Sequence, residues 1–281
     1  MTGFATAIRR DAVRVSGPDA ATFLQGQLSQ DVDSLAVSTS TWTFVLQPDG
    51  KVHTWARLTK TAADVFVLDT DHGAGEALGK RLARFLMRTK AEVEPLALEG
   101  FAVRGEHLPH PEVADGVLRL PSAHHLGYDV LGAGAVAPEG VDAVAAETLE
   151  AHRIEHGIPA MGAELHDSVI PAEVGQWIID ESVSFTKGCF VGQELVARID
   201  SRGGNVPRLL RAIVCDAAVE VGEEVETTGP ASAVTSAAVS ATHGPIALAY
   251  CGRKVEPGQQ VVVGSTQGVV HEVPLPAVGD G

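Results

Sequence analysis

The spacing of apolar residues along the chain predicts three helices. Ser16 can cap a first helix at about 18–29, in which apolar residues return to one face at every turn. The residues at 142–156 give another helical pattern. A helix over about 73–88 is predicted from apolar residues at i, i+4, i+7 and i+8, namely Leu78, Leu82, Phe85 and Leu86.

The helix predicted over 73–88 also carries a group of cations without an acid among them. Cations near a helix C-terminus are favoured by the helix dipole, and a solvated face explains them most simply. In so acidic a chain they could also hold an anionic ligand or partner. The residues are Lys80, Arg81, Arg84, Arg88 and Lys90.

Runs of β-branched and aromatic residues predict strands in both halves of the chain. Strands are expected at 41–46, 51–58 and 64–70, with the turn sequence QPDG between the first two. The segment 157–207 is poor in regular periodicity and rich in Gly, Pro and polar residues. Short strand-like runs without a strong helix follow it, which predicts a small all-β domain, a barrel, from about 207 onward.

Composition and charge narrow the classes of function. With 45% hydrophobic and 20% charged residues, the 281-residue chain is typical of soluble globular proteins. Its net charge of -15 argues against nucleic acid or an anionic membrane as a partner, because both require clustered positive charge. No apolar run approaches the ~20 residues that span a bilayer. The first residues do not show a signal-peptide pattern, so we expect a cytoplasmic protein.

The three cysteines, Cys189, Cys215 and Cys251, are widely spaced and form no C-x-x-C pair. An odd number in a cytosolic chain argues against a disulfide framework. It also argues against a self-sufficient zinc or iron–sulfur site, which usually uses closely spaced thiolates. We therefore expect no permanently bound metal.

The densest candidate chemistry lies in FTKGCFVGQELVAR, residues 185–198. A cysteine beside a lysine and near a helix start has its thiolate favoured, which makes Cys189 a candidate reactive thiol. Lys187 could instead bind a carboxylate or phosphate as a point charge. The structural alternative is a turn into a helix, with Gly192 near the cap and Gln193–Glu194 in the first turn. The residue chemistry alone leaves these interpretations equally weighted.

Other kinds of site are less well supported by the sequence. The order of lysine and glycines does not match a Walker phosphate loop. Nucleophilic catalysis by Cys189 would need a base, and the histidines nearest in sequence are His152, His156 and His166. Glu155, at the end of a predicted helix, could accept paired N–H groups from an aminopyrimidine or pterin ring, or simply pair with Arg153 or a nearby solvent-facing cation.

Taken together, these stretches resemble the YgfZ-type folate-binding proteins, a family related to the aminomethyltransferase (T-protein) of the glycine cleavage system. RIEHGIPAMGAEL, around Glu155, looks like the family's R-x-E-x-G-x-P segment, and VSGPDAATFLQGQLSQDV looks like its opening helix. The family's K-G-C-aromatic-x-G-Q-E string continues to Arg198 and is matched by Lys187, Gly188, Cys189, Phe190, Gly192, Gln193 and Glu194.

The resemblance implies an α+β fold of three domains in a ring around a central channel that can hold tetrahydrofolate. We therefore expect a folate-binding-like domain at 1–95, a second α+β domain with the K-G-C string at 96–206, and a β-barrel at 207–281. Lys187 and Cys189 would lie close to the channel. The folate-binding residues that the resemblance implies are Glu155 at the pterin end, Arg198, Gly188, Gly192, Gln193 and Glu194.

The family is linked to the making or repair of a subset of iron–sulfur enzymes. We therefore expect a tetrahydrofolate-binding accessory protein whose partners are iron–sulfur enzymes or assembly proteins, with Lys187 and Cys189 as its functional pair. A folate-dependent one-carbon transferase and a non-catalytic folate-binding module are the alternatives. True T-proteins carry an acidic pair after an early hairpin turn, where this chain has His53, Thr54 and Trp55, and Asp49 lies earlier, in the turn itself. Without that carboxylate, acid–base help to the folate nitrogen is missing, which argues against aminomethyl transfer.

Overall fold

The computed structural model describes residues 3–227 and 232–276, and the chain forms two compact units. The first unit comprises the residues up to Val144 together with 166–168 and 177–198. The second unit comprises 145–165, 169–176 and the residues from Ile199 onward.

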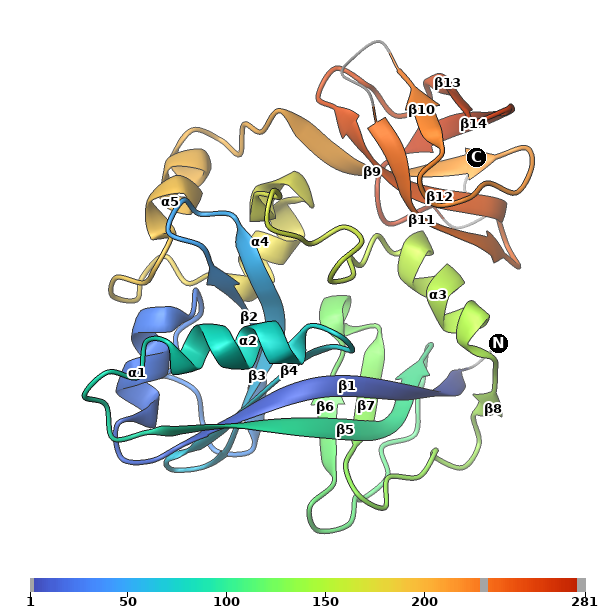
Figure 1. The fold of residues 1–281 in the computed structure, drawn as a ribbon. Coiled ribbons are helices and arrows are strands. Elements are labelled where there is room, and N and C mark those ends of the chain that lie inside the picture. The colour runs from blue at the N-terminus through green and yellow to red at the C-terminus, as the bar shows by residue number, and fades with distance from the viewer. Residues whose placement is uncertain (1–2, 228–231, 277–281) are drawn as a thin grey trace. The chain divides into compact units, whose positions relative to one another are not determined.

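An eight-stranded sheet is the main element of the first unit, and its two longest strands run side by side (Figure 1). These strands, β1 (Phe4–Ser16) and β5 (Glu92–Arg104), pair antiparallel over their whole length. The order along the sheet is β2-β3-β4-β1-β5-β7-β6, and β8 pairs in parallel with β1. The other strands are β2 (Thr39–Leu46), β3 (Val52–Ala62), β4 (Val65–Asp71), β6 (Leu118–Pro121), β7 (Gly127–Leu131) and β8 (Asp142–Ala143).

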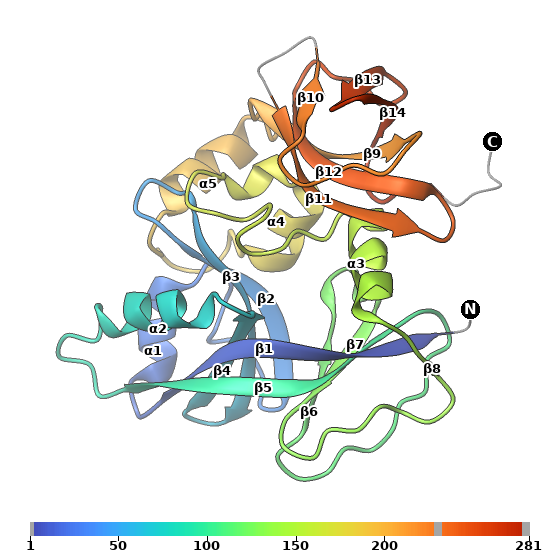
Figure 2. The same cartoon turned by 45° about the vertical axis from the view of Figure 1, so that its right-hand side comes forward.

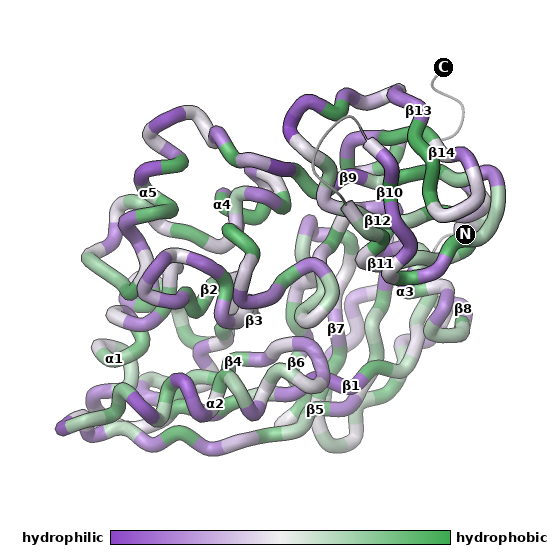
Figure 3. The backbone as a smooth tube through the Cα atoms, turned by 45° about the horizontal axis from the view of Figure 1, so that its top comes forward, coloured by the Kyte–Doolittle hydropathy of each residue, from purple (hydrophilic) through white to green (hydrophobic). Residues whose placement is uncertain are grey.

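Two helices, α1 (Ala20–Gln27) and α2 (Gly75–Ala83), pack their apolar sides on this sheet. The apolar positions of α2 face the core while Lys80 is exposed, and Figure 3 shows hydrophilic and hydrophobic stretches in turn along this helix. The shared core is built from alternate strand residues and one face of each helix, and includes Val13, Val15, Leu24, Leu28, Val45, Ala56, Leu58, Phe66, Leu68, Leu78 and Leu82.

The second unit contains helix α3 (Ala146–Glu155) and a closed barrel in the order β10-β11-β12-β9-β14-β13 (Figure 2). The barrel predicted from about residue 207 onward is therefore confirmed, and it begins with β9 at Arg208. Valine, alanine and isoleucine side chains fill it, as expected for a chain poor in aromatics. Its strands are β9 (Arg208–Cys215), β10 (Glu224–Glu226), β11 (Ser232–Ser240), β12 (Gly244–Gly252), β13 (Gln260–Val263) and β14 (Thr266–His271).

Two short helices lie in the segment where the sequence showed little periodicity. These are α4 (Gln176–Ser182) and α5 (Gln193–Ser201), and the single turn η2 (Pro171–Glu173) precedes them. Another single turn, η1 (Ala123–His125), leads into β7. No helix in the described part of the chain is long and apolar enough to cross a membrane.

One predicted helix is shorter than its apolar pattern indicated. The helix expected over 73–88 ends at Ala83, and turns follow it, with Arg88 at a left-handed φ of 63°. Phe85 is 41% exposed and Met87 is 83% exposed, so burial does not hold this segment in a helix.

The three-domain division at 95/96 and 206/207 stays a prediction. The first boundary falls inside β5, and the second falls just before β9.

Candidate functional site

The motif loop, residues 185–192, joins α4 to α5 and is bound to the end of α1 through Lys187. Its Nζ donates to the carbonyl oxygens of Gln25 at 2.6 Å, Leu28 at 2.6 Å and Gln30 at 2.9 Å. Carbonyls at a helix C-terminus lack intrahelical partners and favour a cation. Because an ammonium has three N–H donors, these three bonds use all of them, and none is left for an anionic substrate.

Burial lowers the pKa of Lys187 to about 8, while the nearby carboxylates of Asp31 and Asp33 act against this shift. The ammonium form therefore still predominates at neutral pH, which the three carbonyl acceptors require. Phe190 adds a contact, with its ring centroid 5.2 Å from Nζ. The lysine is thus a positioning residue that fixes the start of the motif loop.

The end of the motif loop is fixed by a close backbone approach. Gly192 has φ +82°, and a Cβ there would overlap the Gln47 carbonyl and lie 2.8 Å from Leu46 Cβ. From the other side, Gly50 has φ +83°, and a Cβ there would lie 2.5 Å from Leu195 Cβ. The turn between β2 and β3 therefore packs directly on the start of α5, and only glycine fits at both points.

Cys189 lies between these two fixed points and is exposed. The backbone N–H of Val191 also donates to the Gly26 carbonyl at 3.3 Å, so the loop is held to α1 on both sides of the thiol. By contrast, Cys215 and Cys251 are buried, and desolvation raises the pKa of each thiol to about 11. The motif loop thus presents one accessible thiol on a rigid support.

The other motif residues take structural or surface positions. Gln193 Oε1 accepts a hydrogen bond from the Phe190 N–H at 3.1 Å, which closes the turn into α5. Glu194 and Arg198 lie exposed on that helix. A Cβ on Gly188 would meet nothing within 4 Å, so packing does not require glycine there.

Glu155 lies at the end of α3 in the second unit. Its Oε1 accepts a hydrogen bond from the Ser240 hydroxyl on β11, and its backbone carbonyl accepts one from Leu275 at 2.7 Å. For Arg153, considered above as a partner of Glu155, the structure shows bonds to other carboxylates. Arg153 instead donates to Glu164, which is fully buried, at 3.0 Å, and this pair joins α3 to the barrel through Ser236.

The hairpin position that carries acids in T-proteins holds a buried threonine and a half-buried histidine. Thr54 is fully buried, and its Oγ1 lies 2.8 Å from His53 Nδ1. Burial, and secondarily the charge of Arg81, lowers the pKa of His53. Asp49 pairs with the neighbouring Lys51 at 3.2 Å on the surface.

A chain of ion pairs in the first unit was not predicted from the sequence. Arg57 is fully buried and pairs with Asp69 and Asp129, each at 2.9 Å. Arg10 bonds to Asp69 at 2.6 Å, and Arg104 bonds to Asp129 at 2.9 Å. The neighbouring arginines lower the pKa of Asp129 to about 2 despite its burial.

The contact among the three tryptophans was likewise not predicted. Trp42 and Trp55 stack with ring centroids 4.1 Å apart, and Trp177 stands edge-on to Trp55 at 6.2 Å. The His124 ring lies 3.8 Å from the Trp177 ring. We call these four residues the tryptophan cluster.

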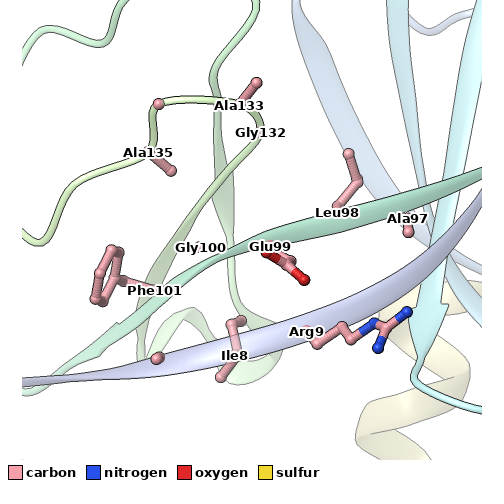
Figure 4. A pocket seen from close by; sticks show the side chains of 12 residues that line it. Ile8, Arg9, Ala97, Leu98, Glu99, Gly100, Phe101, Gly132, Ala133 and Ala135 are labelled. Carbon is pink, nitrogen blue, oxygen red and sulfur yellow. The ribbon is translucent and has the colours of Figure 1, made fainter.

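A hollow of about 770 Å³ lies over β1 and β5, beside the loop after β7 (Figure 4). Its charged side chains are Arg9 and Glu99, which are cross-strand partners. Its other lining residues are alanine, glycine, Ile8, Leu98 and Phe101. This hollow therefore offers one carboxylate, from Glu99, and no thiol, hydroxyl or imidazole among its lining side chains.

No protein-family model matches the chain. An uncharacterised protein of Haemophilus influenzae is 26% identical over 233 residues, covering 80% of this chain and 79% of that protein. The tRNA-modifying protein YgfZ of Edwardsiella ictaluri is 31% identical, covering 69% of this chain and 65% of that protein. The mitochondrial iron–sulfur cluster assembly factor IBA57 of Mus musculus is 29% identical, with coverages of 69% and 61%. The chain thus spans slightly less than two thirds of these two named relatives.

Among solved structures, the glycine cleavage system aminomethyltransferase T from Bartonella henselae matches with a TM-score of 0.76 at 18% identity. The match covers 96% of this chain and 86% of that one, which confirms the predicted T-protein-like α+β fold. The predicted resemblance is confirmed as well: the chain is a relative of the YgfZ and IBA57 proteins, built on the fold of the glycine cleavage T-protein.

Proposed function

We propose that the protein binds tetrahydrofolate and assists the assembly or repair of iron–sulfur proteins in the cytosol. The observation that carries the proposal is Cys189, an exposed thiol on a loop fixed at both ends. Relatives named as iron–sulfur cluster assembly factors support this assignment.

Cys189 would act as a transient ligand of the cluster or as a redox-sensitive thiol. Thiolates are the usual protein ligands of iron in such clusters. A single accessible thiol can supply one ligand while a cluster, as cargo, passes to a client. Lys187 would contribute by holding the loop, because its three N–H donors are already bonded to carbonyls.

Each unit, taken by itself, carries polar groups of the kind that a folate ring needs. In the first unit, the buried indole N–H groups of Trp42 and Trp177 and the buried Oε2 of Glu181 have no hydrogen-bond partner within the described residues. In the second unit, Glu155 offers a carboxylate at the end of α3, where the resemblance expects the pterin contact. Tetrahydrofolate, when bound, would supply ring nitrogens that carry one-carbon groups.

We also propose that the partners are iron–sulfur enzymes or assembly proteins rather than RNA. The Edwardsiella relative is named as a tRNA-modifying protein. For this chain a net charge of -15 opposes direct binding to a polyanion. An effect on tRNA would then arise through a client enzyme.

The test of the thiol is complementation in a bacterial strain that lacks its own YgfZ-type protein. We expect Cys189→Ala to lose the rescue of iron–sulfur enzyme activity with an unchanged Tm. The matched control is Thr186→Ala, an exposed change in the same loop, which should rescue fully. Full rescue by Cys189→Ala would remove the thiol from the proposal.

The test of folate binding is calorimetric titration of the full chain with tetrahydrofolate. Absence of binding would remove folate from the proposal. A direct assay with glycine-cleavage carrier protein and tetrahydrofolate addresses the transferase alternative, and turnover above background would replace the present proposal.

A further inference from the structure

Another hollow, of about 470 Å³, lies in the first unit beside the loop that follows β5. Its volume is in the range of small-molecule sites in proteins. No acid is among the described residues that line it, whereas the hollow over β1 and β5 contains Glu99 opposite Arg9. We call it the histidine hollow, after three of the four nitrogen-bearing side chains that line it, namely His107, His110, Arg119 and His125.

The N–H groups of these four side chains are largely unused within the protein. Arg119 donates from its Nη1 to the Pro111 carbonyl at 3.1 Å. A guanidinium has five N–H donors, and an imidazole keeps at least one in either protonation state. No ion pair within the described part of the chain involves Arg119 or these histidines. Glu181 lies close enough to His125 to interact electrostatically, but its Oε1 is bonded to the His124 N–H.

The loop beside the histidine hollow is held in place at several points. The Tyr128 hydroxyl donates to the Pro109 carbonyl, and the Gly105 N–H donates to the Leu126 carbonyl at 3.3 Å. Leu108 packs against the cluster of buried residues that includes Tyr128. Because the walls are fixed before a ligand enters, binding costs little conformational entropy in the protein.

The backbone at two of the lining histidines is strained. His107 and His125 have left-handed conformations, with φ of 51° and 53°. Such conformations are unfavourable for residues with a Cβ, and residues held in them gather at ligand sites. Both side chains nevertheless line the same hollow, which is the arrangement expected of a binding site.

The histidine hollow also has an apolar part. Leu108, Pro121 and Tyr128 line it, and the His110 ring stacks on the Tyr128 ring with centroids 5.8 Å apart. A bare phosphate ion is far smaller than this hollow and would leave the apolar part uncovered. The hollow therefore suits an anion that carries an organic group.

From these features we propose that the histidine hollow binds a small organic phosphomonoester. Its phosphate oxygens accept hydrogen bonds from Arg119 and the histidines, and its organic group lies against Leu108 and Pro121. A phosphomonoester carries about -1.5 to -2 charge and three strong acceptor oxygens at pH 7, and the planar fork of arginine matches phosphate geometry. The net charge of -15 opposes a polyanion spread over the surface. It does not oppose a single phosphate group in a hollow without acids.

This inference goes beyond the proposed function and does not depend on it. The lining residues of the histidine hollow lie outside the motif loop, and none of them is a folate contact that the family resemblance implies. The two sets of experiments can therefore succeed or fail separately.

The experiment uses the full chain and three probes: phenyl phosphate, inorganic phosphate and benzoate. Calorimetry gives the affinities, and the amide signals of Gly105 and Gly127 in ¹H–¹⁵N NMR spectra report binding at the histidine hollow. We expect phenyl phosphate to bind saturably and to shift these signals. Inorganic phosphate should bind about tenfold more weakly, because it buries no apolar surface. Benzoate should bind more weakly still than phenyl phosphate, because it offers one charge and two oxygens.

Matched variants test the assigned contacts. Arg119→Gln should weaken the binding of phenyl phosphate about tenfold or more, as expected for lost hydrogen bonds to a charged group. The double variant His107→Asn with His125→Asn withdraws two imidazoles and should weaken it about tenfold, while asparagine tolerates the left-handed backbone. Arg9→Gln, an exposed change in the other hollow, is the control and should bind like the parent. Near-ultraviolet circular dichroism checks that each variant is folded.

Three results would overturn the inference. The first is a folded parent protein that does not bind phenyl phosphate. The second is an equal loss of affinity in Arg119→Gln and Arg9→Gln, which would indicate unspecific attraction by positive charge. The third is equal affinity for phenyl phosphate and for inorganic phosphate or benzoate, which would remove the phosphomonoester. None of these results bears on folate binding or on Cys189.

Discussion

Replacing Lys187 with methionine tests whether this lysine positions the motif loop or takes part in chemistry. The change keeps an unbranched side chain of similar length and removes the ammonium. Three carbonyl oxygens at the end of α1 then lose a donor at 2.6–2.9 Å. The start of the motif loop loses its connection to α1, while the Gly192–Gly50 packing at its other end is untouched.

The size of the effect follows from the three bonds and their partial exposure. A hydrogen bond to a charged group contributes about 1.5–3 kcal/mol net. Lys187 is only half-buried, so water can reach some of the freed carbonyls and the three contributions do not add in full. We expect a loss of about 2–4 kcal/mol in the free energy of unfolding. That is a large fraction of the stability of a typical domain.

The assay combines urea unfolding with hydrogen exchange. In Lys187→Met the Val191 N–H, which donates to Gly26, should exchange faster than in the parent. Lys80→Met is the matched control, because Lys80 lies on the surface of α2 with its side chain 75% exposed, and it should behave like the parent. If Lys187→Met matched this control in both measurements but lost function in cells, the positioning argument would be refuted and a chemical role would be required.

Three further outcomes are expected. Gly192→Ala should destabilise the protein by about 2–4 kcal/mol through steric overlap and its positive φ. Gly188→Ala should lie within about 0.5 kcal/mol of the parent in urea unfolding. Equal urea midpoints for the two variants would contradict the packing described. Arg57→Met should cost less than the about 3–5 kcal/mol of a fully unpaired buried charge, because Arg10 still pairs with Asp69 and Arg104 with Asp129. Since the pKa of Asp129 is lowered from 3.8 to about 2, its stabilising contribution is present above pH 3.8 and is lost as the pH falls toward 2; an unchanged acid transition in Arg57→Met would speak against this coupling. A thiol reagent should titrate one cysteine in the native protein and three in denaturant, and Cys189→Ala should abolish the native signal.

The regular elements could largely be predicted because their signals are local. The apolar spacing near residues 18–29 became α1, and the runs at 41–46, 51–58 and 64–70 correspond to β2, β3 and β4. The barrel was predicted because short strand-like runs replace the Gly- and Pro-rich segment near residue 207. The first barrel strand begins there, at Arg208.

Strand β1 was missed because its exposure does not alternate. Exposure alternates around Ala7 and Arg9, but residues 4–6 are all buried and Ala12 and Val13 are buried next to each other, so the period of two is broken. Similarly, α4 and α5 are too short to show a helical period of their own.

The candidate site could be predicted only in part. The K-G-C string identified the loop, but the partners of Lys187 lie 157–162 residues away in sequence, so its bonds to carbonyls could not be inferred from the motif. The tryptophan cluster draws Trp42, Trp55 and Trp177 from separate elements. Such contacts depend on tertiary packing, which no local pattern encodes.

The ion pairs in the first unit also determine how its sheet can be aligned. Arg57 lies directly opposite Asp69 in the pairing of β3 with β4, and it reaches Asp129 on β7, which is not its neighbour in the sheet. A slip of any of these strands by one residue would turn its charge to the other face. That slipped sheet would bury an arginine or an aspartate without its partner, at a large cost. Charge thus adds a second penalty against a slipped register, beside the exposure of apolar side chains that the same slip would cause.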